Sequence, residues 1–277
     1  MPRGPVMDYV PDIQNSCYSL NIQESLAVID FFGDIYELGT SMGLKDDFFS
    51  HLQAINHSPK IRALLLFNVP GVLGDEKYCT FMSNAIEART GRKRRNNHGA
   101  KYSDSSVQIE RQNITLNQFV RTMSKFSKLL LIGFEGDIAP PFFGAGLAAD
   151  YRFGTDEMTF QPSHIKLEMP PGGGLGFFLP KLIGHKKTRD FLFSEEPTSA
   201  FDLHQLGLLD GHLPSEGFRD ECIKIADGLA RLTLPAIMEI KAILNLNSRN
   251  LKEFLDNEDR ATELAIVRKQ NQLKTTR

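Results

Sequence analysis

Residues 128–184 constrain the fold of this 277-residue chain more than any other segment. They predict an apolar strand, a turn rich in Gly and Pro, a helix of small residues that ends at Asp150, and two short strands. A second Pro- and Gly-rich turn then begins another helix. Strands and helices in such an alternating order favour an α/β body.

Two further apolar runs, residues 25–31 and 61–68, predict strands, and the second is so continuously apolar that both of its faces should be covered. Residues 46–56 lie between them and carry apolar side chains at helical spacing, so the three segments predict a β-α-β crossover. Between these strands and the central stretch, the sequence predicts helices over 76–89 and 113–126 and a solvated loop over 90–107. The central stretch itself begins with a buried strand over 128–134.

The last part of the chain has a different pattern. Residues 215–231, 234–245 and 250–270 hold apolar positions at helical spacing with almost no strand signal. The sequence therefore predicts a loose N-terminal arm over 1–18, an α/β core over 19–214 and an all-helical C-terminal region over 215–277.

Composition narrows the class of protein. Hydrophobic residues make up 41% and charged residues 24%, and the net charge of -2 gives no general attraction to nucleic acid or to anionic surfaces. The three cysteines, Cys17, Cys79 and Cys222, follow no metal-ligand spacing and indicate a reducing compartment. With no apolar core of a signal peptide and only strand-length apolar runs, we expect a cytoplasmic protein without a membrane span or a metal site.

The order of motifs in residues 135–144, 160–184 and 198–214 resembles the crotonase superfamily, the enoyl-CoA hydratases and isomerases. The similarity extends over roughly residues 20–270. It implies a crotonase-like spiral of β-β-α units with a helical C-terminal region that forms homotrimers, sometimes stacked into hexamers. It also implies a bound acyl-CoA whose thioester carbonyl lies between two backbone N–H groups, which stabilise an enolate oxygen.

Two positions depart from the family's chemistry. Gly144 and His164 stand where the resemblance places the two catalytic glutamates. Gly144 has no acid–base group, whereas an imidazole can transfer protons near neutral pH. For His164 two interpretations stay open: an acid–base residue, or a structural residue that bonds to a backbone partner. Glu168 lies near the second turn, where it is either a replacement acid or a solvated carboxylate.

The backbone donors depart as well. Pro141 matches the residue whose N–H would bind the carbonyl, and proline has no N–H. Phe142 or Phe143 could donate instead if the turn is remodelled, although their rings would crowd the thioester. Leu73 would be the other donor if Gly74 aligns with the family's glycine. In the second turn, Gly172 and Gly173 precede a helix, where they form either an anion-receptive site or a tight turn.

These features predict a crotonase-like protein that lacks standard hydratase activity and is retained to bind an acyl thioester or a partner. The alternative is an isomerase, decarboxylase or hydrolase acting on an acyl-CoA or acyl-carrier thioester through His164 or Glu168. No cofactor is expected; a coenzyme A thioester would be the substrate or ligand, and an acyl-carrier protein a partner. The basic run over 89–101 is either a solvated loop or a contact for coenzyme A phosphates, an acidic partner or, least favoured, nucleic acid.

Overall fold

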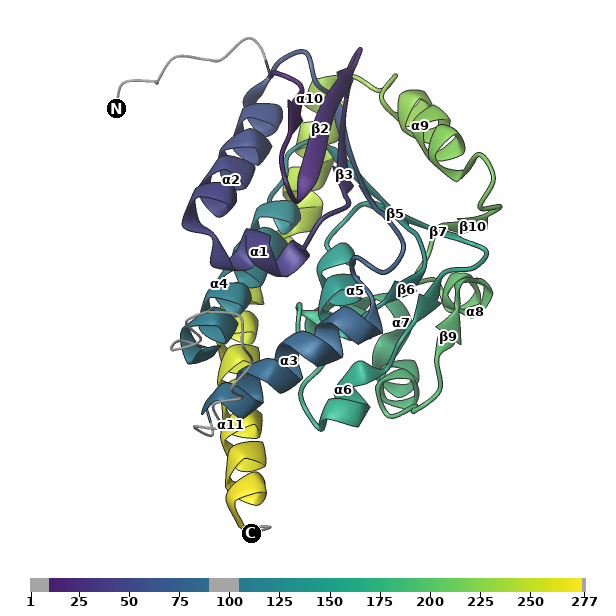
Figure 1. The fold of residues 1–277 in the computed structure, drawn as a ribbon. Helices are drawn as coiled ribbons and strands as arrows, with labels where there is room; N and C mark the ends of the chain where they lie inside the picture. Colours follow the sequence, from purple (N-terminus) through teal and green to yellow (C-terminus); the bar gives the residue numbers. More distant parts are fainter. Residues whose placement is uncertain (1–9, 90–104, 276–277) are drawn as a thin grey trace.

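The computed structural model describes residues 10–89 and 105–275, which are organised around a seven-stranded sheet (Figure 1). The strand order is β1-β2-β3-β4-β5-β7-β10. The pairs β1–β2 and β2–β3 are antiparallel, and every pair from β3 onward is parallel. The strands are β1 (Ile13–Gln14), β2 (Tyr18–Gln23), β3 (Leu26–Phe31), β4 (Ala63–Asn68), β5 (Leu129–Phe134), β7 (Tyr151–Thr155) and β10 (Gly211–Leu213).

The central strands β4 and β5 are buried along their whole length, as parallel strands covered on both faces must be. The predicted crossover is confirmed, because β3 and β4 pair in parallel and helices connect them. The helices that precede β5 are α1 (Ile35–Thr40), α2 (Met42–His57), α3 (Asp75–Arg89) and α4 (Ser105–Ser124).

Hydrophobic side chains cover both faces of the sheet. The larger core joins one face to α1, α2, α4 and α5 (Pro140–Gly146) and includes Phe48, Leu52 and Val120. The smaller core lies on the other face, where Phe218 and Cys222 of a C-terminal helix pack against the strands. Each face of the sheet therefore depends on a different part of the chain.

The order of the main elements predicted for residues 128–184 is confirmed, but the first helix ends at Gly146 and not at Asp150, and the sequence did not predict the short elements at residues 137–138 and 163–167. A three-stranded sheet, β6-β8-β9, accompanies the two Gly- and Pro-rich turns, and a short helix, α6, follows the second of its strands. The elements are β6 (Asp137–Ile138), α5 (Pro140–Gly146), β8 (Thr159–Phe160), α6 (Ser163–Leu167), α7 (Leu175–Leu192), β9 (Thr198–Ser199) and α8 (Ala200–Gln205).

The C-terminal region is helical, as predicted, and consists of α9 (Phe218–Leu229), α10 (Leu234–Leu244), a 3-10 turn (Asn245–Ser248) and α11 (Leu251–Thr275). Lys241 of α10 reaches into the body, where its Nζ donates to the Lys128 carbonyl at 2.7 Å and pairs with the Asp150 carboxylate. The α11 helix packs against α3 and α4 and extends below the body in Figure 1.

The structure differs from the predicted N-terminal arm over 1–18 and from the predicted loop over 90–107. Of the arm predicted over 1–18, residues 1–9 lie outside the described residues, but β1 pairs with β2 and Tyr18 is fully buried. The Tyr18 ring packs 5.1 Å from the Phe48 ring, which holds this segment on the core. The loop predicted over 90–107 ends earlier, since α4 already begins at Ser105.

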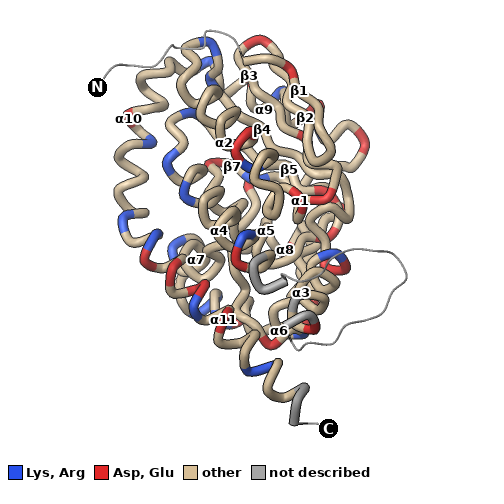
Figure 2. The backbone as a smooth tube through the Cα atoms, turned by 60° about the vertical axis from the view of Figure 1, so that its left-hand side comes forward, with Lys and Arg blue, Asp and Glu red and all other residues tan. Residues whose placement is uncertain are grey.

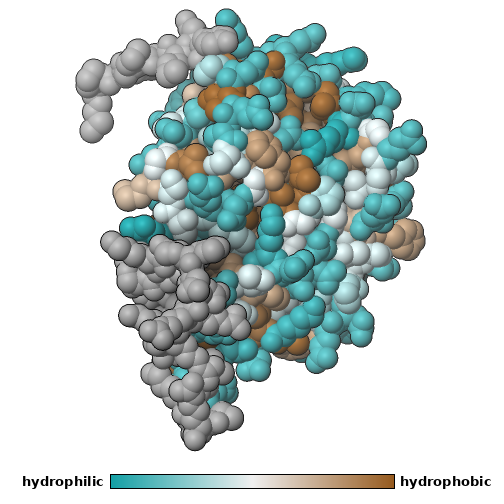
Figure 3. All heavy atoms as spheres, in the orientation of Figure 1, coloured by the Kyte–Doolittle hydropathy of each residue, from teal (hydrophilic) through white to brown (hydrophobic). Residues whose placement is uncertain are grey.

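The face of the molecule seen in Figure 3 is mostly hydrophilic, with small separate hydrophobic areas. Within residues 10–89 and 105–275, no helix combines the length and the apolar character needed to cross a bilayer. The α10 helix runs along the outside of the body with few charged positions (Figure 2).

Candidate functional site

The two turns that the sequence singles out are packed backbone against backbone. A Cβ at Gly144 of α5 would lie 2.9 Å from the Gly173 carbonyl oxygen and 2.9 Å from the Leu175 nitrogen. A Cβ at Gly173 would in turn lie 1.9 Å from the Pro141 carbonyl oxygen. The structure thus brings Gly144, Pro141 and Gly173 together, and the second turn leaves no room for a side chain at position 144.

Left-handed backbone makes this approach possible. Gly172, Gly173 and Gly174 have φ of +78°, +64° and +75°, a region that residues with a Cβ rarely occupy. The three glycines therefore form a tight turn, which is one of the two interpretations that the sequence left open.

The backbone donors at the start of α5 are already engaged. Phe142 and Phe143 both donate their N–H to the Ala139 carbonyl at 3.1 Å, and Pro141 has no N–H. The Phe143 ring is fully buried and packs 5.7 Å from Phe134. Neither phenylalanine N–H is therefore free to bind a ligand in this conformation.

The loop after β4 lies directly against α5. The Leu73 carbonyl accepts from the Ala139 N–H at 2.8 Å, and a Cβ at Gly74 would lie 2.7 Å from the Asp137 carboxylate. For the Leu73 N–H, the described part of the chain offers no hydrogen-bond acceptor. It is the one predicted oxyanion donor that stays available in the described structure.

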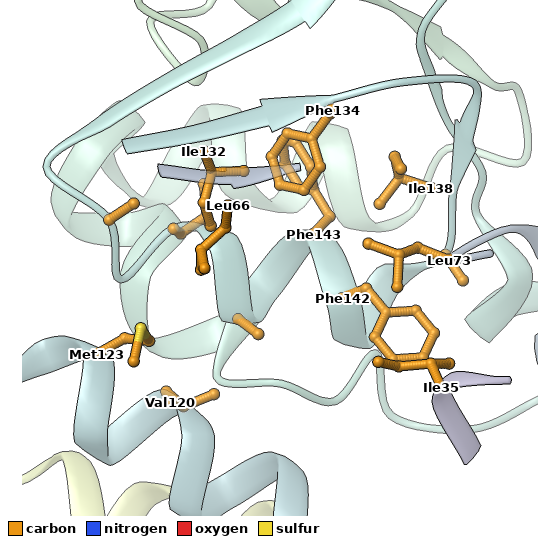
Figure 4. Close-up of a cluster of buried hydrophobic side chains, with 14 of the residues drawn as sticks. Ile35, Leu66, Leu73, Val120, Met123, Ile132, Phe134, Ile138, Phe142 and Phe143 are labelled. Atoms are coloured by element: carbon orange, nitrogen blue, oxygen red, sulfur yellow. The ribbon is translucent and has the colours of Figure 1, made fainter. Parts of the chain in front are cut away.

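An apolar cavity of about 80 Å³ lies between the sheet and helices α1, α2, α4 and α5. The Phe142 ring and Leu73 lie side by side at one end of it, next to Ile35 (Figure 4). Its walls are formed by Phe31, Ile35, Leu38, Phe48, Phe49, Leu66, Phe67, Asn68, Leu73, Gln112, Thr115, Leu116, Phe119, Ile132, Gly133, Phe134, Phe142, Ala145 and Gly146. Such a lining suits a hydrocarbon group and offers little to a charged one.

His164 lies in α6 and does not line this cavity. Its side chain is 4% exposed, and Nε2 lies 2.8 Å from the Leu192 carbonyl, where it donates. Burial lowers the pKa of His164, so its imidazole is neutral at pH 7. This backbone partner matches the structural interpretation of His164, and its catalytic role stays a prediction.

Glu168 ends α6 in a left-handed conformation with φ of 52°. Its side chain is 66% exposed and lies 3.9 Å from the Lys269 amine. Glu168 is therefore a solvated carboxylate in this structure. The side chains of the basic run over 89–101 lie outside the described residues.

A carboxyl group that the sequence analysis missed adjoins the glycine turn. Glu258 of α11 accepts a hydrogen bond from the Gly174 N–H at 2.9 Å through Oε2. It lines a second cavity, of about 30 Å³, together with Pro141, Phe142 and Gly173. The signal in the sequence was an acid on the apolar stripe of a helix, three residues after the buried Leu255.

Burial raises the pKa of Glu258 to about 7, opposed by the Gly174 N–H and helped by the neighbouring Asp259 carboxylate. Burial also raises the pKa of Asp259 to about 6, although Asn117 donates to Asp259 at 2.6 Å. Both acids thus hold protons more tightly than solvated carboxyl groups. Among the described residues no group of three His, Cys, Asp or Glu side chains could hold a metal ion.

Known proteins with similar sequences decide the family. The model of the Enoyl-CoA hydratase/isomerase family matches residues 136–273. YhaR of Bacillus subtilis, which carries an enoyl-CoA hydratase/isomerase name, is 28% identical over 160 residues. The EchA12 protein of Mycobacterium bovis, which carries an enoyl-CoA hydratase name, is 25% identical over 183 residues.

The chain belongs to the crotonase superfamily. The matched regions cover 56% and 61% of this chain but only 61% and 64% of those two relatives. The crystal structure of enoyl-CoA hydratase from Bacillus halodurans aligns with a TM-score of 0.71 at 18% identity, covering 92% of this chain and 97% of that one. Methylmalonyl-CoA decarboxylase aligns with a TM-score of 0.66 at 19% identity, covering 94% of this chain and 96% of that one. The predicted crotonase fold is confirmed.

The close contact at Gly144 can be tested by adding one carbon. Gly144→Ala should lower the free energy of unfolding by about 1–3 kcal/mol, because its Cβ overlaps backbone atoms that cannot rotate away. Gly228→Ala in α9 is the matched control: nothing lies within 4 Å of its Cβ, and alanine is favoured over glycine in a helix by up to about 1 kcal/mol. Urea unfolding measures the free energy of unfolding of both variants. An unchanged value for Gly144→Ala would contradict the close contact.

The raised pKa of Glu258 predicts how stability depends on pH. The folded state holds this proton more tightly than the unfolded chain, so the stabilisation is complete below about pH 4.5 and is lost as pH rises through about 7. Glu258→Gln keeps an acceptor for the Gly174 N–H and removes the ionisation. It should match the wild type at pH 5 and exceed its free energy of unfolding by about 1–3 kcal/mol at pH 8. An equal difference at both pH values would contradict this assignment.

Proposed function

We propose that this crotonase-superfamily protein binds an acyl thioester and does not carry out the two-glutamate hydratase reaction. The observation that carries the proposal is the packing of the glycine turn against Gly144. Where the resemblance places the first catalytic glutamate, backbone atoms fill the space into which such a side chain would extend. Hydration in this family moves two protons, one from the attacking water and one to the α carbon, and the resemblance places Gly144 and His164 where the two glutamates would do so.

The engaged backbone donors support the same function. With Pro141 lacking an N–H and the Phe142 N–H bonded to Ala139, a thioester carbonyl would meet the Leu73 N–H alone. Loss of one oxyanion donor typically lowers catalytic rates by about 100- to 1000-fold. A single donor still suffices to orient a bound carbonyl.

The apolar cavity supports acyl binding. The Leu73 side chain lines it, so a thioester whose carbonyl meets the Leu73 N–H would direct its acyl group into this chamber. The volume of about 80 Å³ and the walls of phenylalanine and leucine favour a short apolar acyl group. The thiol is that of coenzyme A or of an acyl-carrier protein.

The names of the relatives suggest hydratase activity instead, and one pair of measurements separates the two functions. We expect no hydration of 2-butenoyl-CoA or 2-octenoyl-CoA above the buffer rate, measured as loss of the enoyl absorbance. Isothermal titration with butyryl-CoA should show binding. Ala145→Leu should abolish that binding by filling the cavity, and its melting temperature serves as the folding control. Hydration at ordinary enzymatic rates would contradict the proposal.

We further propose that the chain assembles as a homotrimer or a dimer of trimers through its C-terminal helices. Exposed apolar side chains on α10 and the turn after it support this, with Ile243 68% exposed. Only Ile237 and Lys241 of α10 are buried against the body. The exposed apolar residues of these segments are Met238, Ile240, Ile243, Leu244 and Leu246.

Static light scattering at micromolar concentration should return the mass of three or six chains. The double variant Ile240→Glu and Ile243→Glu should shift this mass to one chain, because carboxylates would be buried at the interface. A wild-type protein of monomer mass would contradict the assembly.

A further inference from the structure

The second cavity combines the carboxyl groups of Glu258 and Asp259 with polar side chains from three other helices, α1, α3 and α4. Glu258 reaches it from α11, where the Gly174 N–H fixes Oε2 at 2.9 Å. No partner for Oε1 is found within the described residues. At about 30 Å³, the cavity has room for about one water molecule.

Two nearly buried polar groups in the wall of this cavity lack partners. Tyr36 is 7% exposed, and its hydroxyl has no hydrogen bond within the described part of the chain. Gln112 is 9% exposed, and its Oε1 likewise has no donor among the described residues, but this oxygen packs against Gly39 of α1. Unpaired buried polar atoms are rare, and a bound polar molecule is a usual explanation.

The second cavity lies next to the apolar cavity proposed to bind the acyl group. Phe142, Gln112 and Leu116 line both cavities, so the polar space begins where the apolar chamber ends. Pro141, which the resemblance places beside the thioester carbonyl, also lines the polar space. A thioester with its acyl group in the apolar chamber would therefore present its carbonyl near the polar one.

We propose that Glu258 is the general base of an acyl-thioester hydrolase site and activates a water molecule held by the Tyr36 hydroxyl. This inference rests on the acyl-thioester binding proposed above and adds the reaction. Glu258 and the neighbouring Asp259 line a space for about one water molecule, and hydrolysis needs only one of these carboxyl groups, as the base. Hydration of an enoyl group also needs a proton delivered to carbon.

The step balances without another reactant. Glu258 takes a proton from water as the water oxygen bonds to the thioester carbonyl carbon, and the carbonyl electron pair moves onto its oxygen at the Leu73 N–H. When that pair returns, the carbon–sulfur bond breaks and the thiolate takes the proton from Glu258. The products are a carboxylic acid and a free thiol.

The ionisable side chains that line this cavity together with Glu258 are Asp259 on its own helix, Tyr78 on α3 and Tyr36 on α1. Burial holds the tyrosines in their neutral forms by raising their pKa values. Glu258 ionises near neutral pH, where a general base is most effective. The hydrolytic rate should therefore rise through about pH 7.

The experiment measures thiol release from acetyl-, butyryl- and octanoyl-CoA with a chromogenic disulfide, alongside binding by titration. Glu258→Gln should reduce release by at least about 100-fold while butyryl-CoA still binds. Tyr36→Phe keeps the ring stacked on Phe81 and should reduce release by about 10-fold. Glu253→Gln, an exposed position on the same helix, is the matched control and should not change the rate.

The possible outcomes separate the hydrolase inference from the proposed acyl binding. Binding without thiol release above the buffer rate overturns the hydrolase inference and leaves acyl binding standing. Release that persists in Glu258→Gln also overturns the inference, because another base must act. If no thioester binds and none is hydrolysed, both proposals fall. A rate that does not change between pH 6 and pH 8 contradicts Glu258 as the base.

Discussion

The contact between α5 and the glycine turn determines the rest of this site. Gly144 and the glycines at 172, 173 and 174 have no Cβ, and the turn lies so close that a Cβ at Gly144 would be 2.9 Å from the Gly173 carbonyl oxygen and from the Leu175 nitrogen. This approach closes the space beside α5, directs the Gly174 N–H toward α11 and leaves the apolar cavity on the opposite side of Phe142. The exclusion of a side chain at Gly144 and the hydrogen bond from Gly174 to Glu258 thus both result from the same packing contact.

The C-terminal helices are fixed to the body by polar groups as well as by apolar packing. Lys241 joins α10 to Asp150 and to the Lys128 carbonyl, and Glu258 joins α11 to the glycine turn. Buried charged groups cost free energy unless they are paired, so these bonds define one position for each helix. In this crotonase-superfamily chain the helical region is therefore anchored to the body and contributes Glu258 to the wall of the second cavity.

Most of the fold could be predicted from the sequence because its strands are unbroken apolar runs and its turns carry glycine and proline. The short helix α6 could not, since five residues between prolines give no helical period. Tyr18 was assigned to a loose arm because its burial depends on Phe48, 30 residues later. Glu258 was missed for a similar reason: its partner, Gly174, lies 84 residues earlier in the chain. The resemblance singled out Gly144, Pro141 and His164, but the residues packed around them depend on the tertiary structure and could not be predicted.

The left-handed glycine turn has a consequence for how this site can change over evolutionary time. The three positive φ angles of the turn and the absence of a Cβ at position 144 depend on one another. A side chain at position 144 would require the turn to move away from α5, and the same turn is also bonded to Glu258 of α11. A larger residue at position 144 would require changes in the turn and in α11 as well. Substitutions at these three places are therefore expected to occur together and not singly.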